Sequence, residues 1–154
     1  MKCLIADDDP RIRQLLISLL ERPGWEFLEA ACGLEALALY EAHGPDLVIM
    51  DIEMSPMDGI TAIRAMRQRH ALCKVLMVSQ HNSSRFRQAA AAVGAIGYVL
   101  KDDLHGVIEA LAQHLPSPVS DGGEESPSSI VAFSENKAFG EKGDRRLREF
   151  EPNQ

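Results

Sequence analysis

The sequence predicts an α/β fold in which a parallel β-sheet is covered by helices on both faces. Short apolar runs alternate with longer amphipathic segments through the first 115 residues. The runs are nearly continuous rather than interrupted by polar residues, which is typical of strands that are buried on both faces. The longer segments have the periodicity of helices. This alternation of strands and helices predicts a three-layer domain.

Five apolar runs are expected to form the strands, and each contains four to six residues. This is the usual length of a strand in a globular protein. The run at 25–30 is weaker than the others. The pattern alone does not give the order of the strands. The expected strands are residues 3–6, 25–30, 47–50, 75–78 and 96–100.

Five helices are expected to connect and follow these strands. The first has one apolar stripe, because its large aliphatic residues are spaced at i, i+3, i+4, i+7 and i+8. It is expected to end before Pro23 and Gly24, which form a helix stop. The other helices are expected at about 34–42, 59–70, 84–93 and 104–114. The stripe of the first helix consists of Ile12, Leu15, Leu16, Leu19 and Leu20.

The composition changes at Pro116 and divides the chain into a globular domain, residues 1–115, and a tail, residues 116–154. Thirteen of the fourteen residues at 116–129 are Pro, Ser, Gly, Asp or Glu. Such a segment cannot bury enough apolar surface to offset the entropy lost on ordering it. We therefore predict a linker and a mostly disordered tail, with a short apolar patch at 130–133.

Charge and composition disfavour several classes of function. The formal net charge is −7, and the first 115 residues contain no cluster of Lys and Arg, which disfavours contact with nucleic acid. No apolar run approaches the roughly 20 residues of a membrane helix, and no signal peptide is recognised. The three cysteines are far apart and odd in number, which indicates reduced thiols in a cytoplasmic protein.

Polar side chains follow four of the expected strands, at the point where each strand ends. Ligands bind at the carboxyl ends of the strands in sheets of this kind. We therefore expect these side chains to converge on one edge of the sheet. They are Asp7, Asp8 and Asp9 after the first strand, Asp51 after the third, Ser79 after the fourth and Lys101 at the end of the fifth.

This set of residue types suits phosphoryl transfer with a divalent cation. Neighbouring carboxylates repel one another unless a cation lies between them, and Mg²⁺ is usually held by one or two carboxylates and a phosphate. A carboxylate can attack phosphorus and form an aspartyl phosphate. We expect Asp51 to attack, and Asp7 and Asp8 to hold Mg²⁺. Lys101 would pair with the phosphoryl group, and Ser79 would donate a hydrogen bond to it.

Each of these residues also has a simpler interpretation. Residues 7–9 could cap the helix that begins near Pro10 and complement its dipole. Asp51 and Ser79 could be ordinary turn and helix-entry residues, and Lys101 could be a solvated residue at a strand end. The specificity lies in the combination, because an accidental meeting of these four side-chain types at four strand ends is improbable.

Four longer motifs cover about residues 2–115: LIADDDPRIRQLL, ACGLEALALYEAHGPDLVIMDIEMSPMDGI, VLMVSQHNSS and AIGYVLKDD. With them the chain resembles the receiver domain of two-component response regulators. The resemblance implies a flavodoxin-like (βα)₅ fold with strand order 2-1-3-4-5. It also implies Mg²⁺-dependent transfer of a phosphoryl group to Asp51 from a sensor histidine kinase or a phosphotransfer protein. GYVLKDD and VSQH are most similar to the LuxR/NarL-type subgroup, whose output is a helix-turn-helix.

The resemblance implies a role for each metal ligand. Asp8, Asp51 and the backbone carbonyl of Glu53 would hold the metal directly, and Asp7 would hold it through water. Lys101 matches the lysine of the family. The domain would be a phosphoacceptor that assists its own phosphorylation and dephosphorylation, not an enzyme with a separate substrate.

The resemblance also implies a conformational switch. When Asp51 carries a phosphoryl group, the Ser79 hydroxyl is expected to move toward it and the Tyr98 ring to turn inward. The alternative is that Tyr98 is an aromatic residue at the rim with a single rotamer. Phosphorylation is also expected to permit a homodimer.

The sequence departs from the family pattern at three places. The family often has Pro four residues after the acceptor, whereas this chain has Ser55 followed by Pro56, so the loop is expected to differ. Gln80 stands where a small residue is common and would narrow access to the acceptor. Many relatives have a cis proline after the lysine, but Asp102 follows Lys101, and a trans bond is expected.

Three other functions compete with a working receiver. A haloacid-dehalogenase-type phosphatase would need a second Asp two residues after Asp51, where this chain has Glu53, and a cap insertion that is missing. A flavodoxin would need a hydroxyl- and Gly-rich loop after the first strand, where the carboxylates would instead repel phosphate. The third alternative stays open, namely a degenerate receiver that acts only as a docking or dimerisation module.

Partner surfaces are expected at two places. A kinase would dock across the first helix, with Ile12 as an apolar anchor and Arg11 at the rim, because a phosphohistidine must approach Asp51 from the strand ends. The alternative is that Ile12 belongs only to the core stripe. Residues 1–154 are expected not to contact DNA. The basic residues at 145–148 either lead into a DNA-binding output domain downstream, belong to a tail that ends naturally, or touch a partner.

Overall fold

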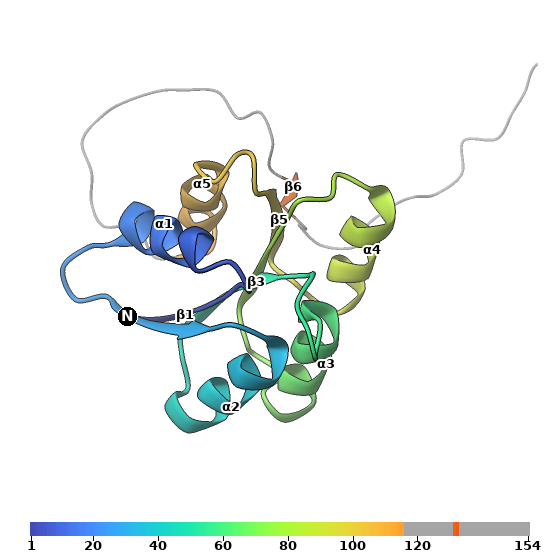
Figure 1. Cartoon of the computed structure of the whole chain (residues 1–154), viewed down its shortest axis with the longest axis horizontal. Helices are drawn as coiled ribbons and strands as arrows, with labels where there is room; N and C mark the ends of the chain where they lie inside the picture. The colour runs from blue at the N-terminus through green and yellow to red at the C-terminus, as the bar shows by residue number, and fades with distance from the viewer. Residues whose placement is uncertain (116–130, 133–154) are drawn as a thin grey trace, which may run out of the picture.

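A central β-sheet lies between two layers of helices in the computed structural model, which describes residues 1–115 and 131–132 (Figure 1). Strands and helices alternate along the chain as expected. The strands are β1 Lys2–Ala6, β2 Glu26–Ala30, β3 Leu47–Asp51, β4 Val75–Ser79, β5 Gly97–Leu100 and β6 Val131–Ala132. The helices are α1 Pro10–Leu20, α2 Gly33–His43, α3 Gly59–Arg69, α4 Ser84–Ala92 and α5 Gly106–Ala112.

The first five strands are parallel and lie in the order β2-β1-β3-β4-β5, which confirms the expected flavodoxin-like topology. The sheet has one addition that the sequence pattern does not predict. β6 pairs antiparallel with the outer edge of β5, within the segment 130–133 that the sequence indicates only as an apolar patch of the tail. The other residues predicted to form the linker and tail lie outside the described residues.

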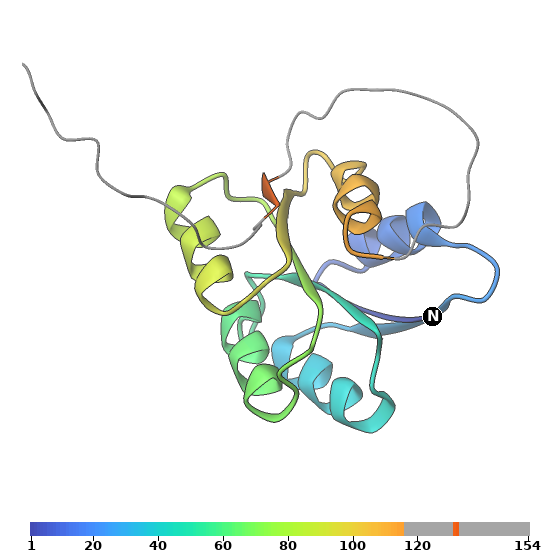
Figure 2. The ribbon, with the colours of Figure 1, turned by 180° about the vertical axis from the view of Figure 1, so that it is seen from behind.

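The core consists of two apolar clusters, one on each face of the sheet. The first cluster lies between the sheet and helices α2, α3 and α4. The second lies between the sheet and helices α1 and α5 (Figures 1 and 2). Successive residues of a strand point to opposite faces. In β1, for example, Leu4 joins the first cluster and Ile5 the second. All five residues of β3 and of β4 are buried, which explains why their sequences are continuous apolar runs up to the final polar residue.

The expected apolar stripe of α1 is only partly buried. Leu16 and Leu20 are fully buried, and Ile12 packs against them with part of its surface exposed. Leu15 differs from the expectation, because 47% of its surface is exposed. The helix begins where the sequence indicates, since the Asp9 carboxylate caps its N-terminus by accepting from the backbone N–H of Arg11.

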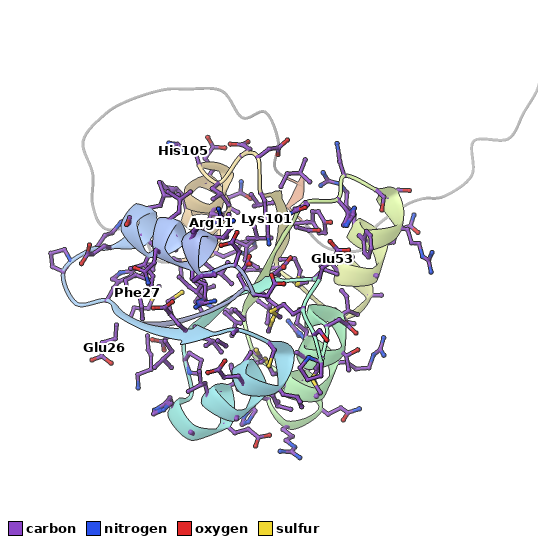
Figure 3. The ribbon with its side chains drawn as sticks, viewed as in Figure 1. Arg11, Glu26, Phe27, Glu53, Lys101 and His105 are labelled. Carbon is purple, nitrogen blue, oxygen red and sulfur yellow. The ribbon has the colours of Figure 1, made fainter. Side chains whose placement is uncertain are left out.

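The fold brings functional groups to the carboxyl edge of the sheet. Arg11, Glu53 and Lys101 lie toward this edge, whereas Glu26 and Phe27, at the start of β2, lie far from it (Figure 3). No helix in the described part of the chain is long and apolar enough to cross a membrane.

Candidate functional site

The centre of the site is a buried lysine between two carboxylates. Lys101 follows β5, and its ammonium nitrogen lies 2.7 Å from Asp7 Oδ2 and 3.0 Å from Asp51 Oδ2. The side chains of Asp7 and Asp51 are 2% and 3% exposed, so these ion pairs are shielded from water. The structure therefore brings together three residues that are far apart in the sequence and that sequence analysis placed at one site.

The backbone around Asp7 fixes the direction of its carboxylate. The other carboxylate oxygen, Oδ1, accepts a hydrogen bond from the backbone N–H of Asp9 at 2.9 Å. The Asp7 carbonyl accepts from the Arg13 guanidinium at 2.7 Å, and the Asp7 N–H donates to the Ala30 carbonyl. With one oxygen on the backbone and one on Lys101, Asp7 has little freedom to move.

Ionisation of the Asp51 carboxyl group is unfavourable in its buried position. Desolvation by burial raises the pKa of Asp51 to about 6, although hydrogen bonding and charge attraction from Lys101 act in the opposite direction, and the nearby Asp7 charge adds to the rise. Lys101 shows the complementary effect. Burial would lower its pKa, but its hydrogen bonds to Asp7 and Asp51 outweigh burial and raise it.

Three carboxylates approach closely enough to share a cation. One carboxylate oxygen from each of Asp7, Asp8 and Asp51 lies within 4.8 Å of the others. Asp7 and Asp51 are buried and Asp8 is exposed, so the group has a buried side and a side open to solvent. Three carboxylates and the Lys101 ammonium leave a formal charge of −2. Such an oxygen-rich and negatively charged group suits a hard divalent cation.

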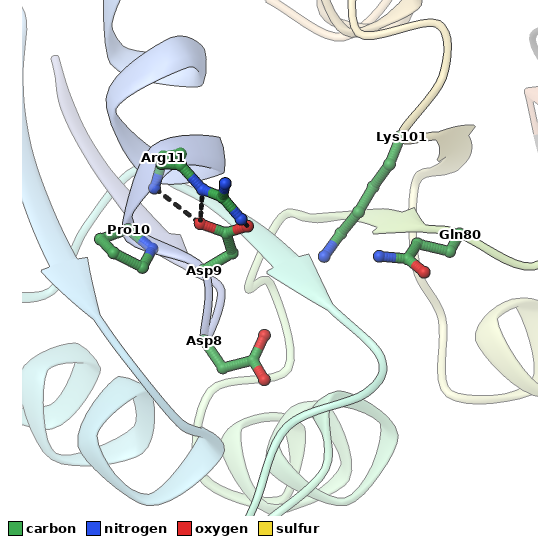
Figure 4. A pocket seen from close by; sticks show the side chains of 6 residues that line it. All are labelled: Asp8, Asp9, Pro10, Arg11, Gln80 and Lys101. Carbon is green, nitrogen blue, oxygen red and sulfur yellow. Dashed lines mark hydrogen bonds and ion pairs between the residues drawn. The ribbon is translucent and has the colours of Figure 1, made fainter.

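The site opens to solvent through a pocket of about 490 Å³. Asp8 and the ion pair between Asp9 and Arg11 line one side, and Lys101 and Gln80 lie on the other (Figure 4). Hydrogen bonds from Arg11 lower the pKa of Asp9 to about 2. Gln80 lines the mouth, as its position after Ser79 indicates. Arg11 also lies at the rim as predicted, but it is engaged with Asp9.

Ser79 and Tyr98 belong to a second, uncharged part of the site. Ser79 is completely buried at the end of β4, and its hydroxyl oxygen accepts from the backbone N–H of His81 at 3.1 Å. The Tyr98 hydroxyl donates to the His81 carbonyl at 2.7 Å. The Tyr98 ring is fully buried, which contradicts the alternative that it lies at the rim. The movement of Ser79 and Tyr98 on phosphorylation stays a prediction.

His81 connects this part of the site to the loop after Asp51. Its Nε2 lies 2.7 Å from Glu53 Oε2, and its ring stacks on Phe86 of α4 at 5.0 Å. The histidines are scattered along the sequence like surface residues, so sequence analysis missed this contact. The one sequence signal is the position of His81 two residues after Ser79.

Gly59 is a further positioning residue that sequence analysis missed. A Cβ atom at this position would lie 1.9 Å from the Asp51 carbonyl oxygen and 2.9 Å from its carbon. The Gly59 N–H donates to the Ile52 carbonyl at 2.9 Å. α3 therefore begins directly against the backbone of Asp51, and only glycine permits this approach.

The cis or trans state of the peptide bonds bears on two expectations about the loops. The bond between Lys101 and Asp102 is trans, as expected from the absence of proline. Among the described residues the one cis bond joins Ser55 to Pro56, in the loop that was expected to differ from the family.

Comparisons with known proteins agree with this geometry. The family model described as the response regulator receiver domain matches residues 3–112. The chain is 34% identical over 116 residues to the chemotaxis protein CheY of Bacillus subtilis, covering 74% of this chain and 97% of that protein. It spans about half the length of the transcriptional regulators that it also matches.

Solved structures give the same result. The receiver is similar to a two-component response regulator of the LuxR family from Aurantimonas sp., with a TM-score of 0.69 and 34% identity over 73% of this chain and 83% of that one. It is also similar to a chain of the CheX-CheY-BeF₃-Mg²⁺ complex from Borrelia burgdorferi. There the TM-score is 0.70 and the identity 26%, over 74% of this chain and 88% of that one. Sequence, topology and the carboxylate–lysine site together identify the chain as a member of the CheY-like response regulator receiver family of two-component systems.

Proposed function

We propose that this receiver accepts a phosphoryl group on Asp51 in a Mg²⁺-dependent reaction, and that the phosphohistidine of a sensor kinase or phosphotransfer protein is the donor. The observation that carries the proposal is the pair of contacts from Lys101 to Asp7 and Asp51 beside the exposed Asp8. An acceptor, a cation and an open approach are the requirements of phosphoryl transfer to a carboxylate.

Asp51 is the nucleophile in this proposal. With a pKa of about 6, its carboxylate is mostly ionised at neutral pH yet remains more basic than an exposed aspartate. One of its oxygens attacks phosphorus and the P–N bond to the donor imidazole breaks. The bonding electron pair stays on the imidazole nitrogen, which then takes a proton. Lys101, which already contacts Asp51, would pair with the transferred group as a positive charge.

The residues fit a bound magnesium ion. Asp8 and Asp51 would hold it, together with the backbone carbonyl of Glu53, and Asp7 would hold it through water. When bound, Mg²⁺ neutralises charge on the phosphoryl oxygens. Support comes from the Borrelia burgdorferi complex, whose chain resembles this one and which contains BeF₃ and Mg²⁺.

Mass spectrometry of the intact protein tests the proposal. After incubation with acetyl phosphate and Mg²⁺, the wild type should gain the mass of one phosphoryl group. Asp51→Asn should gain none, and neither should the wild type in EDTA. The control is Asp102→Asn, which changes an exposed aspartate beside Lys101 and should react like the wild type. An equal gain in wild type and Asp51→Asn would refute the acceptor. Failure of the wild type to react would favour the degenerate docking module.

We further propose that the donor protein docks on α1. Ile12 and the exposed Leu15 are one turn apart on this helix, whose first residues, Pro10 and Arg11, line the pocket. Ile12→Ala with Leu15→Ala should slow transfer from a phosphohistidine donor about tenfold, through the loss of contact area, while the rate with acetyl phosphate stays the same. Leu34→Ala is the matched control, because Leu34 of α2 has nearly the same exposure. Equal slowing with both donors would contradict the docking role. Dimerisation on phosphorylation, the lack of DNA contact by residues 1–154 and a DNA-binding output domain stay predictions.

A further inference from the structure

β6 covers an edge of the sheet that is otherwise open to pairing. Residues Val131 and Ala132 pair antiparallel with Tyr98 and Gly97, respectively, and β6 lies beside β5 in both views of the ribbon (Figure 2). An edge strand presents unpaired N–H and C=O groups that accept a further strand. The edge of β5 is therefore a strand-binding surface, and its occupant is a segment of the same chain.

The length of this strand makes its pairing reversible. A two-residue strand contributes few backbone hydrogen bonds, and each contributes little net stability in water. Residues 116–130 connect it to the domain. The entropy lost on closing a loop grows only slowly with the number of residues in it. Small changes at β5 are therefore sufficient to shift the balance between the docked and the free segment.

One of the paired residues belongs to the uncharged part of the site. The Tyr98 backbone faces Val131, while its hydroxyl donates to the His81 carbonyl at 2.7 Å. The His81 N–H donates to the Ser79 hydroxyl at 3.1 Å, and the Lys101 N–H donates to the Ser79 carbonyl at 2.9 Å. A continuous path of short contacts thus runs from β6 to the residues around Asp51.

The Tyr98 ring also contacts α4. The Arg87 guanidinium of α4 lies 4.9 Å from the ring centroid and donates to the Asn82 side chain at 2.8 Å. The docked strand and the fully buried ring occur together in this structure. The docked strand and the buried ring therefore belong to the same conformation of β5.

We propose that residues 131–132 form a docking strand whose pairing with β5 is thermodynamically linked to phosphorylation of Asp51. Docking favours the buried position of Tyr98 and, through His81, an arrangement of Ser79 that holds the phosphoryl group. By linkage, the phosphoryl group strengthens docking by the same factor. This inference rests on the proposed function, because it requires a phosphoryl group at Asp51.

The backbone of β5 provides a direct reporter of docking. The Ile96 N–H donates to the Val75 carbonyl, at the start of β4. Successive amides of a strand point in opposite directions, so the Gly97 amide points to the outer edge, where β6 pairs. The exchange rate of this amide with deuterium therefore reports whether the strand is docked.

The experiment uses the full chain, with beryllofluoride and Mg²⁺ as the mimic of the phosphoryl group. The test variant is Val131→Pro with Ala132→Pro, because proline removes the backbone donors that a strand needs. The matched control is Lys137→Pro with Ala138→Pro, which places two prolines outside β6. NMR measures deuterium exchange at Gly97, and calorimetry measures the affinity for the mimic.

In the wild type and in the control, addition of the mimic should slow exchange at Gly97 about fivefold. In the test variant, exchange at Gly97 should be fast in both conditions, and the mimic should bind about fivefold more weakly. Equal affinity in all three proteins, unchanged exchange at Gly97, or tighter binding by the test variant would overturn the linkage and leave the proposed function standing. Failure of the mimic to bind to any of the three proteins would overturn the proposed function together with the linkage.

Discussion

Two groups of residues meet at the carboxyl edge of the sheet, yet they are held together by different interactions. The first region is ionic, with the carboxylates of Asp7 and Asp51 buried against Lys101. In the second region, called uncharged here because its hydrogen bonds join neutral groups, the bonds run from the Tyr98 hydroxyl through the His81 backbone to Ser79. The charged side chains of Arg87 and Glu53 lie beside it.

This difference shows how one edge of the sheet can hold both a charged site and a group of residues that can change conformation. Charges in a buried site interact strongly. The addition of a phosphoryl group and a cation would therefore change the electrostatic energy of the ionic region by a large amount. Neutral hydrogen bonds differ little in energy between alternative partners, so the uncharged region can rearrange at small cost. Under the proposed function, phosphoryl acceptance is expected of the ionic region and a conformational response of the uncharged region.

The close approach of α3 is expected to produce the largest loss of stability. Gly59→Ala should lower the free energy of unfolding by about 3 kcal/mol, because the new Cβ would overlap the Asp51 backbone. Gly44→Ala is the control. Gly44 has a φ of +54°, and no atom lies within 4 Å of the position that a Cβ would take, so only the backbone strain of about 1 kcal/mol is expected there. Urea denaturation measures both values. Equal losses would show that the acceptor backbone tolerates the extra atom.

The ionic region is expected to reduce stability at neutral pH. The folded-state pKa of Asp51 lies above the ordinary aspartate value of 3.8, so the folded protein binds this proton more tightly than the unfolded chain does. Ionisation of Asp51 therefore costs stability, fully above about pH 6 and not at all well below pH 4. Asp51→Asn should be more stable than the wild type by about 3 kcal/mol at pH 8, and the difference should become small as the pH falls toward 4.

Denaturation of both proteins between pH 4 and 8 measures this difference. Asp102→Asn serves as the control, because Asp102 is exposed and its replacement should give no comparable pH dependence. A difference between wild type and Asp51→Asn that is constant with pH would contradict the buried-charge account of the ionic region.

The uncharged region is expected to give the smallest effect on stability. Tyr98→Phe removes the hydroxyl that donates to the His81 carbonyl and keeps the buried ring, so it should cost about 1 kcal/mol. The measurement is again urea denaturation. A cost above that of Gly59→Ala would mean that the hydrogen bonds of this region are as rigid as the ionic contacts, and the comparison between the regions would fail.

The fold and the meeting of Asp51 with Lys101 can be predicted from the sequence for physical reasons. A strand buried on both faces must be apolar throughout, so β3 and β4 were recognisable from composition alone. Asp51 and Lys101 were found because parallel strands end at one edge, which converts positions in the sequence into positions in space.

The remaining features depend on tertiary contacts that leave no local pattern. The two residues of β6 are too few to show the alternation of a strand. The contact between His81 and Glu53 joins two loops whose conformations the sequence does not specify. Leu15 satisfies the helical spacing, but the width of the buried face is set by the packing of α1 against α5 and the sheet, and Leu15 lies outside it.

The division between the two regions is tested most directly by the rate of Asp51 phosphorylation in two variants. Lys101→Met removes the charge of the ionic region, and Tyr98→Phe removes one hydrogen bond of the uncharged region. With acetyl phosphate and Mg²⁺, mass spectrometry at successive times should show a rate about 100-fold below wild type for Lys101→Met, because a buried cation that faces the reacting group is lost. The rate for Tyr98→Phe should stay within about twofold of the wild type, since that hydrogen bond contributes little. Equal slowing in both variants would contradict the assignment of acceptance to the ionic region alone.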